Sequence, residues 1–308
     1  RWLGLTVGLI LVVVSLSGSW LVYHREWREP DFLLNVQPRT IPIEHLYTKA
    51  VKELNAANGI VIRFPQKPEL PYQFWSMGDV QQRLFVNQYT GEILAKHAPD
   101  YWPYGWIFEL HTEFLAGHQG ENALGIVGVL AVFISVIGVL LWLPKRGQRF
   151  GKHLKIRLNK NSYLRHFDLH RHIGILTAPL FILIFTTGIT LVFNKEFSKL
   201  VNLIADSKIS ETPSPELNQK SGRVSLDLIL ESANAAMKDG RVGIVIIPSK
   251  NKPIIVRKQM PGDPHPNGLN FIHIDSSNGK VLQTITVAQA DIARKLFNWI
   301  YPLHSGQA

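Results

Sequence analysis

Three long apolar runs without a charged residue constrain the fold of this chain more than any other feature. They cover residues 2–23, 123–143 and 173–193. A helix of about 20 residues rises roughly 30 Å, which is the thickness of a bilayer's hydrocarbon core. Buried helices of a large soluble core are the alternative, but three uncharged runs of this length favour membrane spans. The overall apolar fraction of 46% is ordinary for soluble proteins, so its concentration in three runs decides the class.

The first run resembles a secretory signal peptide in position but not in detail. Signal peptides have an apolar core of about 7–15 residues and end at a small-x-small cleavage site. Here the run is longer and ends in WLVYHREW, without such a site. We therefore predict a retained span, and because the chain starts at Arg1 we expect further residues upstream.

The distribution of basic residues predicts the orientation of the spans. Residues 144–172 hold nine Lys or Arg and one acid, whereas residues 24–122 hold nine basic and twelve acidic residues. Short basic loops stay in the cytoplasm. The loop at 144–172 is therefore predicted to lie inside, and the two larger regions outside. A nucleic-acid role for this loop is the weaker alternative, so we expect the lipid bilayer, and no nucleic acid, as the partner.

The absence of cysteine narrows the chemistry available to the chain. Without cysteine there are no disulfides, no Cys-ligated zinc, no iron–sulfur clusters and no covalently attached c-type haem. The sequence also lacks H-E-x-x-H, a P-loop, G-x-S-x-G and a G-x-G-x-x-G in a βαβ context. These absences remove the common hydrolase and nucleotide-binding motifs.

The two regions outside the membrane follow the same order of elements. In the first, apolar positions Ile43, Leu46, Ala50 and Leu54 predict a helix, which is followed by the strand-like runs GIVIRF, YQFWSM and QRLFVNQYTGEIL. In the second, Ser225 can cap a helix with Val224, Leu228 and Ala235 on one side, followed by VGIVIIP, KPIIVRKQM and LNFIHIDSSNGKVLQT. The endings VNQYTGEIL and IDSSNGKVL also correspond. The sequence thus predicts an internal duplication, each half being a span followed by an α+β module.

We therefore expect a membrane α-helical bundle carrying two α+β modules. The pattern also predicts a fourth span after His304, towards which the last segment leads. The predicted segments are span 1 (1–23), module 1 (24–103), an interfacial helix with span 2 (104–143), the basic loop (144–172), span 3 (173–194), module 2 (195–287) and a second interfacial helix (288–308).

Histidines cluster at the predicted ends of the spans. Ionisable groups near membrane helices are functional candidates, and neutral imidazoles from two helices can clamp a haem in an apolar cage. His111 and His304 occupy matching Leu-His positions of the two halves, and His170 precedes the third span. Each of these histidines could instead solvate its tip among headgroups. Weaker candidates are His172, His166, His118, which we expect in a loop between Gly117 and Gly120, and His24.

These residues carry a resemblance to the PepSY-associated transmembrane proteins of bacterial inner membranes. The matching segments extend along essentially the whole chain. They are WLGLTVGLILVVVSLSGSWLVY, LHTEFLAG, LWLPKRG, DLHRHIGILTAPLFILIFTTG, the two turns YTGEIL and SNGKVL, and YPLHSG. Each motif is loose, but their order and spacing together are specific. The resemblance implies four spans, two periplasmic PepSY modules and haem held by histidines.

Characterised members of that family are ferric-siderophore reductases with b-type haem. The resemblance implies two haems: His111 and His304 are the expected axial ligands of a periplasm-side haem iron, and His170 is one ligand of a cytoplasm-side haem. The substrate would be a ferric siderophore, and a cytoplasmic or membrane donor would supply electrons. Expected substrate contacts are the aromatics Trp75, Tyr101, Trp102, Tyr104 and Trp299. The alternative is a non-enzymatic membrane protein whose PepSY modules bind peptides, proteases or transport partners.

Overall fold

The computed structural model describes residues 2–28, 33–78, 82–97, 103–144, 161–206, 222–249 and 252–306, with side chains of 24–28 outside this set. Three of its helices are long and apolar enough to cross a membrane: 2–23 within α1 (Trp2–Arg28), α4 (Gly117–Trp142) and α6 (Ser162–Val192). Their large apolar side chains are mostly exposed in the isolated chain. Such surfaces are stable against lipid and not against water, so the prediction of membrane helices is confirmed.

The chain divides into two compact units. One contains residues 1–18 and 109–197, and the other contains residues 19–108 and 198–308. The first unit holds the beginning of α1, the end of α3 (Tyr104–Glu113), and the helices α4 and α6. The second holds the sheet and its helices, together with most of α7 (Asn194–Ile204) and all of α9 (Ile292–Ser305).

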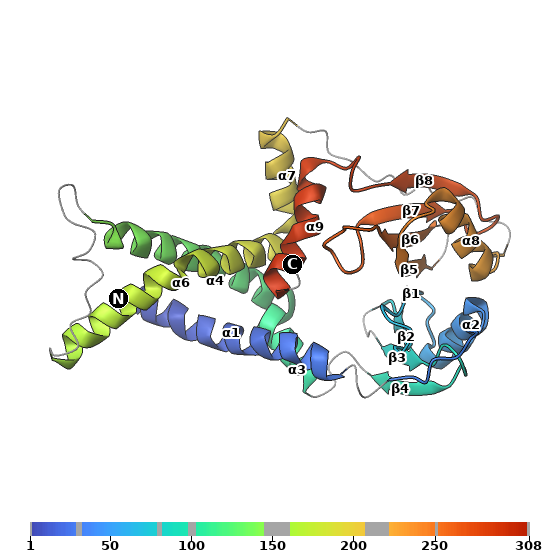
Figure 1. The fold of residues 1–308 in the computed structure, drawn as a ribbon, viewed down its shortest axis with the longest axis horizontal. Helices are drawn as coiled ribbons and strands as arrows, with labels where there is room; N and C mark the ends of the chain where they lie inside the picture. Colours follow the sequence, from blue (N-terminus) through green and yellow to red (C-terminus); the bar gives the residue numbers. More distant parts are fainter. Residues whose placement is uncertain are drawn as a thin grey trace. The chain divides into compact units, whose positions relative to one another are not determined.

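Helices α4 and α6 lie side by side and antiparallel (Figure 1). The contact is close because α4 presents glycines: a Cβ at Gly125 would overlap the ring of Phe193, and one at Gly128 would lie 2.8 Å from Ile189. Small residues at membrane helix interfaces allow this backbone approach, and dispersion contacts then hold the pair together.

Helix α6 begins eleven residues before the predicted third span. Asn161 caps it by accepting a hydrogen bond from the Leu164 amide. Residues 162–172, which the sequence assigned to the basic loop, are therefore helical. Asp168 in this helical segment is fully buried. Hydropathy marks only the part of a helix that lies in the hydrocarbon, whereas the cap marks where the helix begins. The remainder of that loop, residues 145–160, lies outside the described residues.

In the second unit the eight strands found among the described residues form one antiparallel sheet (Figure 1). The strands are β1 (Gly59–Arg63), β2 (Tyr72–Ser76), β3 (Arg83–Val86), β4 (Ile93–His97), β5 (Arg241–Pro248), β6 (Ile254–Gln259), β7 (Asn270–Ile274) and β8 (Val281–Ile285). Their order is β4-β3-β2-β1-β5-β6-β7-β8. Each half of the chain contributes four consecutive strands, and the pairing of β1 with β5 joins them, with Ile60 opposite Ile247.

Two helices cover one face of this sheet. They are α2 (Ile43–Leu54) and α8 (Leu226–Ala236), and the core between helices and sheet consists almost entirely of aliphatic side chains. Alternate strand residues enter this core, which is the pattern expected for a sheet with one covered face. The four apolar positions predicted for α2 are all buried. For α8 the predicted face is wrong: Leu226, Ile229 and Ala233 are buried, whereas Leu228 is 41% exposed.

The two hairpins that end the two halves have the same turn chemistry. In the β3–β4 hairpin Asn87 Oδ1 accepts the amide of Tyr89, and in the β7–β8 hairpin Asp275 Oδ1 accepts the amide of Ser277. Gly91 and Gly279 follow with φ of 70° and 76°, values that favour glycine. Both hairpins also carry a register shift in the strand before the turn. The correspondence read from the two sequence segments is therefore also a correspondence in geometry.

Candidate functional site

His111 on α3 is seated directly against the backbone of α1. Its Nδ1 lies 3.0 Å from the carbonyl oxygen of Val14 and 3.3 Å from Oγ of Ser17. The ring also lies over Gly18, where a Cβ would come within 2.7 Å of the histidine Cε1. The imidazole thus reaches the α1 carbonyl because position 18 has no side chain.

This contact assigns the tautomer of the imidazole. A carbonyl oxygen only accepts, so Nδ1 carries the proton and donates it to Val14, and Nε2 carries the lone pair. Burial lowers the pKa of His111, and the hydrogen bond to the Val14 carbonyl offsets part of that effect. The ring is therefore neutral at pH 7. A neutral imidazole whose far N–H is held by a carbonyl is the form in which histidine binds a metal.

A sharp backbone break separates His111 from the span that follows. Phe114 and Leu115 have φ of 51° and 59°, and α4 then begins at Gly117. The break predicted from the glycines is present, but His118 lies in the first turn of α4 and not in a loop. Its side chain is 83% exposed and contacts Glu121 Oε2 at 3.1 Å. Gly117, with φ of 57°, is the first residue of α4, so the break between α3 and α4 ends before His118.

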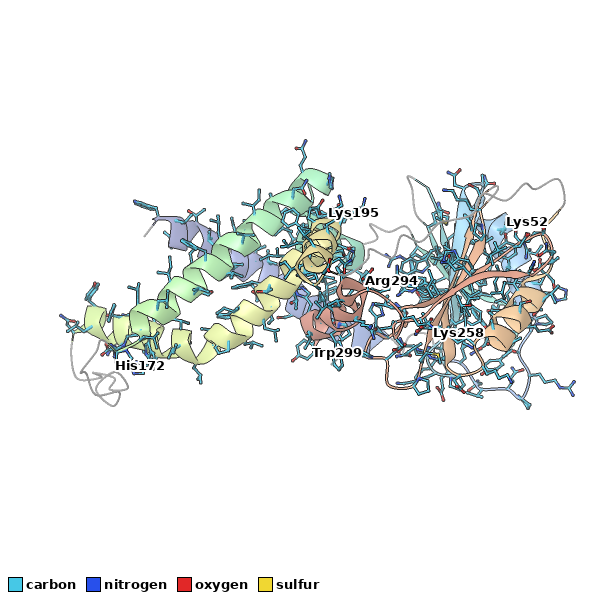
Figure 2. The ribbon with its side chains drawn as sticks, turned by 90° about the horizontal axis from the view of Figure 1, so that it is seen from above. Lys52, His172, Lys195, Lys258, Arg294 and Trp299 are labelled. Carbon is cyan, nitrogen blue, oxygen red and sulfur yellow. The ribbon has the colours of Figure 1, made fainter. Side chains whose placement is uncertain are left out.

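The histidines at the start of α6 differ in their surroundings. His166 and His170 are exposed, and the Nδ1 of His166 contacts the carbonyl of Ser162 at 2.8 Å. His172 Nδ1 lies 2.6 Å from the carbonyl of Asp168, while its Nε2 is buried and has no hydrogen-bond partner among the described residues. Figure 2 labels this residue, which lies in the N-terminal half of α6. His172 therefore shares with His111 a carbonyl-anchored Nδ1, and it is a stronger candidate than its sequence position indicated.

The two histidine groups belong to opposite ends of the α4–α6 pair. His111 precedes the start of α4, and that start packs against Phe193 at the far end of α6. Between His172 and Phe193 the helix rises about 30 Å. The two groups of candidate ligands are thus separated by roughly the thickness of a bilayer's hydrocarbon core.

His304 is half-buried in the last turn of α9. Asp291 caps the beginning of that helix through the Arg294 amide at 2.7 Å, and the buried Asn202 of α7 accepts the Ala293 amide at 3.2 Å. His304 belongs to the second compact unit and His111 to the first. The side chain of His24 lies outside the described residues.

A row of arginines, not anticipated from the sequence, lies on the sheet face opposite α2 and α8. Arg63 of β1 and Arg83 of β3 both stack on Trp75 of β2, with guanidinium carbons 4.1 and 4.3 Å from the ring centroid. Arg257 of β6 lies on the same face, 5.3 Å from the ring of Phe271. Single arginines scattered through three strands give no motif, and only the strand register brings them together.

The aromatic residues predicted to contact substrate are only partly near one another. Trp75 lies in this arginine row, and Tyr104 lies 6.0 Å from the guanidinium of Arg83. Trp299 is 51% exposed on α9, where Figure 2 labels it. Tyr101 and Trp102 lie outside the described residues.

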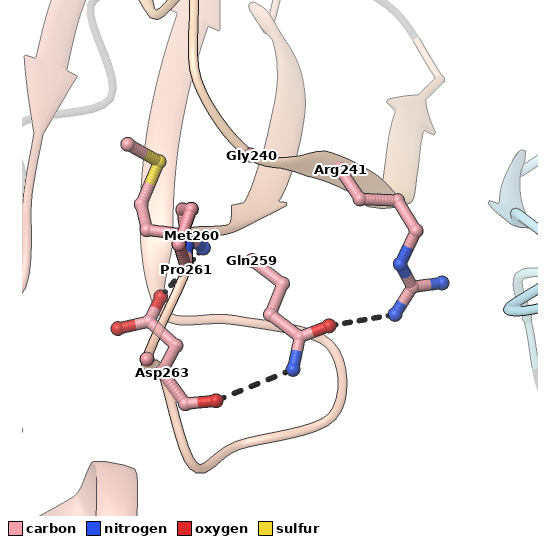
Figure 3. A pocket seen from close by; sticks show the side chains of 7 residues that line it. Gly240, Arg241, Gln259, Met260, Pro261 and Asp263 are labelled. Atoms are coloured by element: carbon pink, nitrogen blue, oxygen red, sulfur yellow. Dashed lines mark hydrogen bonds between the residues drawn. The ribbon is translucent and has the colours of Figure 1, made fainter.

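A shallow hollow lies at the open end of the β5–β6 hairpin, where β5 begins and β6 ends. It is lined by Arg241, Gln259, Asp263 and their neighbours (Figure 3). Its polar groups bind each other: Arg241 Nη2 donates to Gln259 Oε1 at 2.7 Å, and Gln259 Nε2 donates to the Asp263 carbonyl at 3.3 Å. The Asp263 carboxylate accepts from the Met260 amide and from Asn270. These contacts hold a turn together, so we place no site in this hollow.

Comparison with known proteins identifies the family of the chain. The profile of the PepSY-associated TM region matches residues 1–308, the whole sequence. No curated protein matches the chain. The family match agrees with the three candidate membrane helices and with the antiparallel sheet that carries its helices on one face. The chain therefore belongs to the PepSY-associated transmembrane family.

Proposed function

We propose that this protein is an inner-membrane b-type haem protein that passes electrons across the membrane to reduce a ferric siderophore in the periplasm. The observation that supports it most is the seat of His111, whose Nδ1 is anchored to a carbonyl of α1 while Nε2 carries the lone pair. Interfacial histidines that only solvate their tips need no such seat. The burial of this ring against a helix that lacks a side chain at Gly18 favours a ligand.

The donor set fits haem. The chain has no cysteine, so a haem here would not be of the covalently attached c type, in agreement with the proposed b type. His111 and His304 remain the proposed haem ligands on the periplasmic side. At the other end His170 remains the proposed ligand, and the buried Nε2 of His172 makes it a second candidate. Haem, when bound, supplies one-electron transfer, while the protein supplies ligands, orientation and an apolar surrounding.

The residues of the chain perform three tasks in this proposal. The Val14 carbonyl holds the Nδ1 proton of His111 and so keeps Nε2 basic and fixed in direction. The uncharged spans exclude water, which lets an electron carrier function inside the bilayer. The sheet unit would hold the ferric chelate. Reduction to the ferrous state weakens the grip of hard oxygen ligands on the iron.

We further propose that the two halves of the sheet unit arose by internal duplication and lie in the periplasm. The duplication is supported by the matching hairpins and by the helix-then-four-strands order of each half. The periplasmic placement is supported by the charge of segment 144–172. Its basic residues favour the cytoplasm, and the sheet would then lie on the other side of the membrane.

The test is the absorption spectrum of the purified full-length protein from haem-replete cells. We expect a reduced b-type spectrum, and we expect His111→Ala to lose the part of it that belongs to one haem. His118→Ala is the matched control, because this neighbouring histidine is exposed and contacts Glu121 at the surface. A folded but colourless wild-type protein would contradict the proposal. It would favour the alternative of a non-enzymatic membrane protein whose PepSY modules bind peptides, proteases or transport partners.

A further inference from the structure

The face of the sheet opposite α2 and α8 carries an alternating row of cationic and apolar side chains. Across the strand order β3-β2-β1-β5-β6-β7 the residues are Arg83, Trp75, Arg63, Ile244, Arg257 and Phe271, and Arg63 lies diagonal to Trp75 because it pairs with Gln73. We call this row the arginine stripe. Strands lie about 4.8 Å apart, so successive arginines, two strands apart, are separated by about 10 Å at the backbone.

The strands themselves provide no negative charge to balance the stripe. None of the eight described strands contains Asp or Glu. Arg63 lies close enough to Arg257 to repel its positive charge. Burial first, and then Arg63, lower the pKa of Arg257 to about 10. All these guanidinium groups are nevertheless charged at pH 7. The stripe is therefore a concentration of positive charge held in the folded protein.

The loop after β6 and helix α9, both in the same unit, contact residues of the stripe. The loop after β6 approaches it, because Arg257 Nη2 donates to the Gly268 carbonyl at 2.6 Å. Helix α9 approaches it too, with the Arg294 guanidinium 5.3 Å from the Phe271 ring. Arg63, Arg83 and Arg257 are each half-buried. A half-buried charge interacts more strongly with a ligand than an exposed one because water screens it less.

The loop after β6 contains one acid, Asp263, which does not offset the three arginines of the stripe. His265 is neutral, since burial and then Arg257 and Arg63 lower its pKa to about 4. The Asp263 carboxylate is occupied by the Met260 amide and by Asn270. The Nε atoms of Arg83 and Arg257 are buried without a hydrogen-bond partner in the described part of the chain. Stacking on Trp75 and Phe271 accounts for where the guanidinium groups lie, but a neutral side chain could stack there without like-charge repulsion.

We propose that the arginine stripe binds a polycarboxylate anion, and that the ferric chelate handled by this protein is of the carboxylate class with net negative charge. A guanidinium fork matches a carboxylate with two parallel hydrogen bonds. Cations spread over three strands of one sheet face suit an anion with several separated carboxylates and not one phosphate. The identification of that anion as a ferric chelate rests on the proposed function, whereas the anion site itself does not.

The test uses a chelate that cannot be reduced. Gallium(III) citrate has the charge and ligand set of a ferric carboxylate chelate without its redox chemistry. Titration calorimetry on the full-length protein should show binding that weakens as salt is raised. We expect Arg63→Gln and Arg257→Gln each to weaken it about tenfold or more. Arg63→Lys, which keeps the charge but not the fork, should weaken it less.

Arg39→Gln is the matched control, because Arg39 is exposed in the same unit and lies outside the stripe. Its affinity should equal that of the wild type. An uncharged gallium trihydroxamate should bind weakly. Equal affinities in the stripe variants, equal affinity for the uncharged chelate, or complete competition by equimolar inorganic phosphate would overturn the proposal.

The two proposals fail separately in this experiment. Haem absorbance is recorded on the same samples. Gallium citrate binding by a colourless protein supports the anion site while contradicting the haem proposal. A haem-containing wild-type protein with no gallium citrate binding overturns the anion site and leaves the haem proposal standing.

Discussion

At the scale of single residues, one missing side chain determines where His111 lies. A Cβ at position 18 would come within 2.7 Å of Cε1 of this histidine, a distance that real contacts do not reach. Gly8, on the same helix, has nothing within 4 Å of its built Cβ. The two glycines look equivalent in the sequence, and only one of them is required by a neighbour.

We therefore expect Gly18→Ala to displace the His111 ring and break its hydrogen bond to Val14, because the added methyl occupies the space of the ring. The haem spectrum should then change as in His111→Ala, and histidine ¹⁵N NMR should show loss of the Nδ1-protonated tautomer. Gly8→Ala should leave both unchanged, since alanine favours a helix and meets no neighbour there. An unaltered histidine signal in Gly18→Ala would contradict the described contact.

At the scale of elements, α2 and α8 cap each other. Helix α2 begins after Pro42, which supplies no side-chain cap, and instead the carboxylate of Asp227 accepts the amides of Ile43 and Glu44 at 3.2 and 3.4 Å. In return Glu44 accepts the Leu226 amide at 2.7 Å and binds Arg223 at 2.6 Å. Each acid satisfies amides at the beginning of the other half's helix, where the helix dipole also favours negative charge.

Removing either acid should therefore weaken the contact between α2 and α8, which joins the two halves. We expect Glu44→Gln and Asp227→Asn each to lower the free energy of unfolding by about 1–3 kcal/mol, measured by thermal denaturation of the full chain. The double variant should lose less than the sum, because both changes act on the same joint. Glu53→Gln is the control: its ion pair with Lys96 is exposed and should contribute almost nothing.

The pH dependence of the same joint follows from Glu44. Burial raises the pKa of this carboxyl, but Arg223 and the Leu226 amide together lower it below its usual 4.5. A depressed pKa means that the stabilisation is present above pH 4.5 and is lost as the pH falls through the folded-state value. Glu44→Gln should lack this acid-dependent loss, and a melting profile between pH 6 and 3 would reveal the difference.

At the scale of the whole molecule, the orientation in the membrane remains a prediction from charge. The absence of cysteine makes it directly measurable, because single cysteines can be introduced without removing others. We expect Lys52→Cys, exposed on α2, to react in intact spheroplasts with a membrane-impermeant maleimide. Arg165→Cys, exposed at the start of α6, should react only after lysis. The reverse pattern would invert the predicted topology and remove the basis for a periplasmic sheet.

The membrane helices, the order of strands along each half and the positions of the hairpin turns could be predicted from the sequence by itself. These features depend on local causes: uncharged length, alternation of apolar residues, and the turn chemistry of residues such as Asn87 and Gly91. The helical start at residue 162 and the helical position of His118 were missed, because caps and glycines act on the backbone in ways that hydropathy does not record.

Only the tertiary structure decided how residues distant in sequence meet. The pairing of β1 with β5 merges the two modules into one sheet and so aligns Arg63 with Arg257. The packing of α3 on α1 turns an ordinary Leu-His pair into a carbonyl-anchored imidazole at His111. Neither outcome has a local signal, since strand register and helix packing are selected by the apolar contacts of the whole fold. The sequence therefore determined which elements form, and the fold determined which side chains act together.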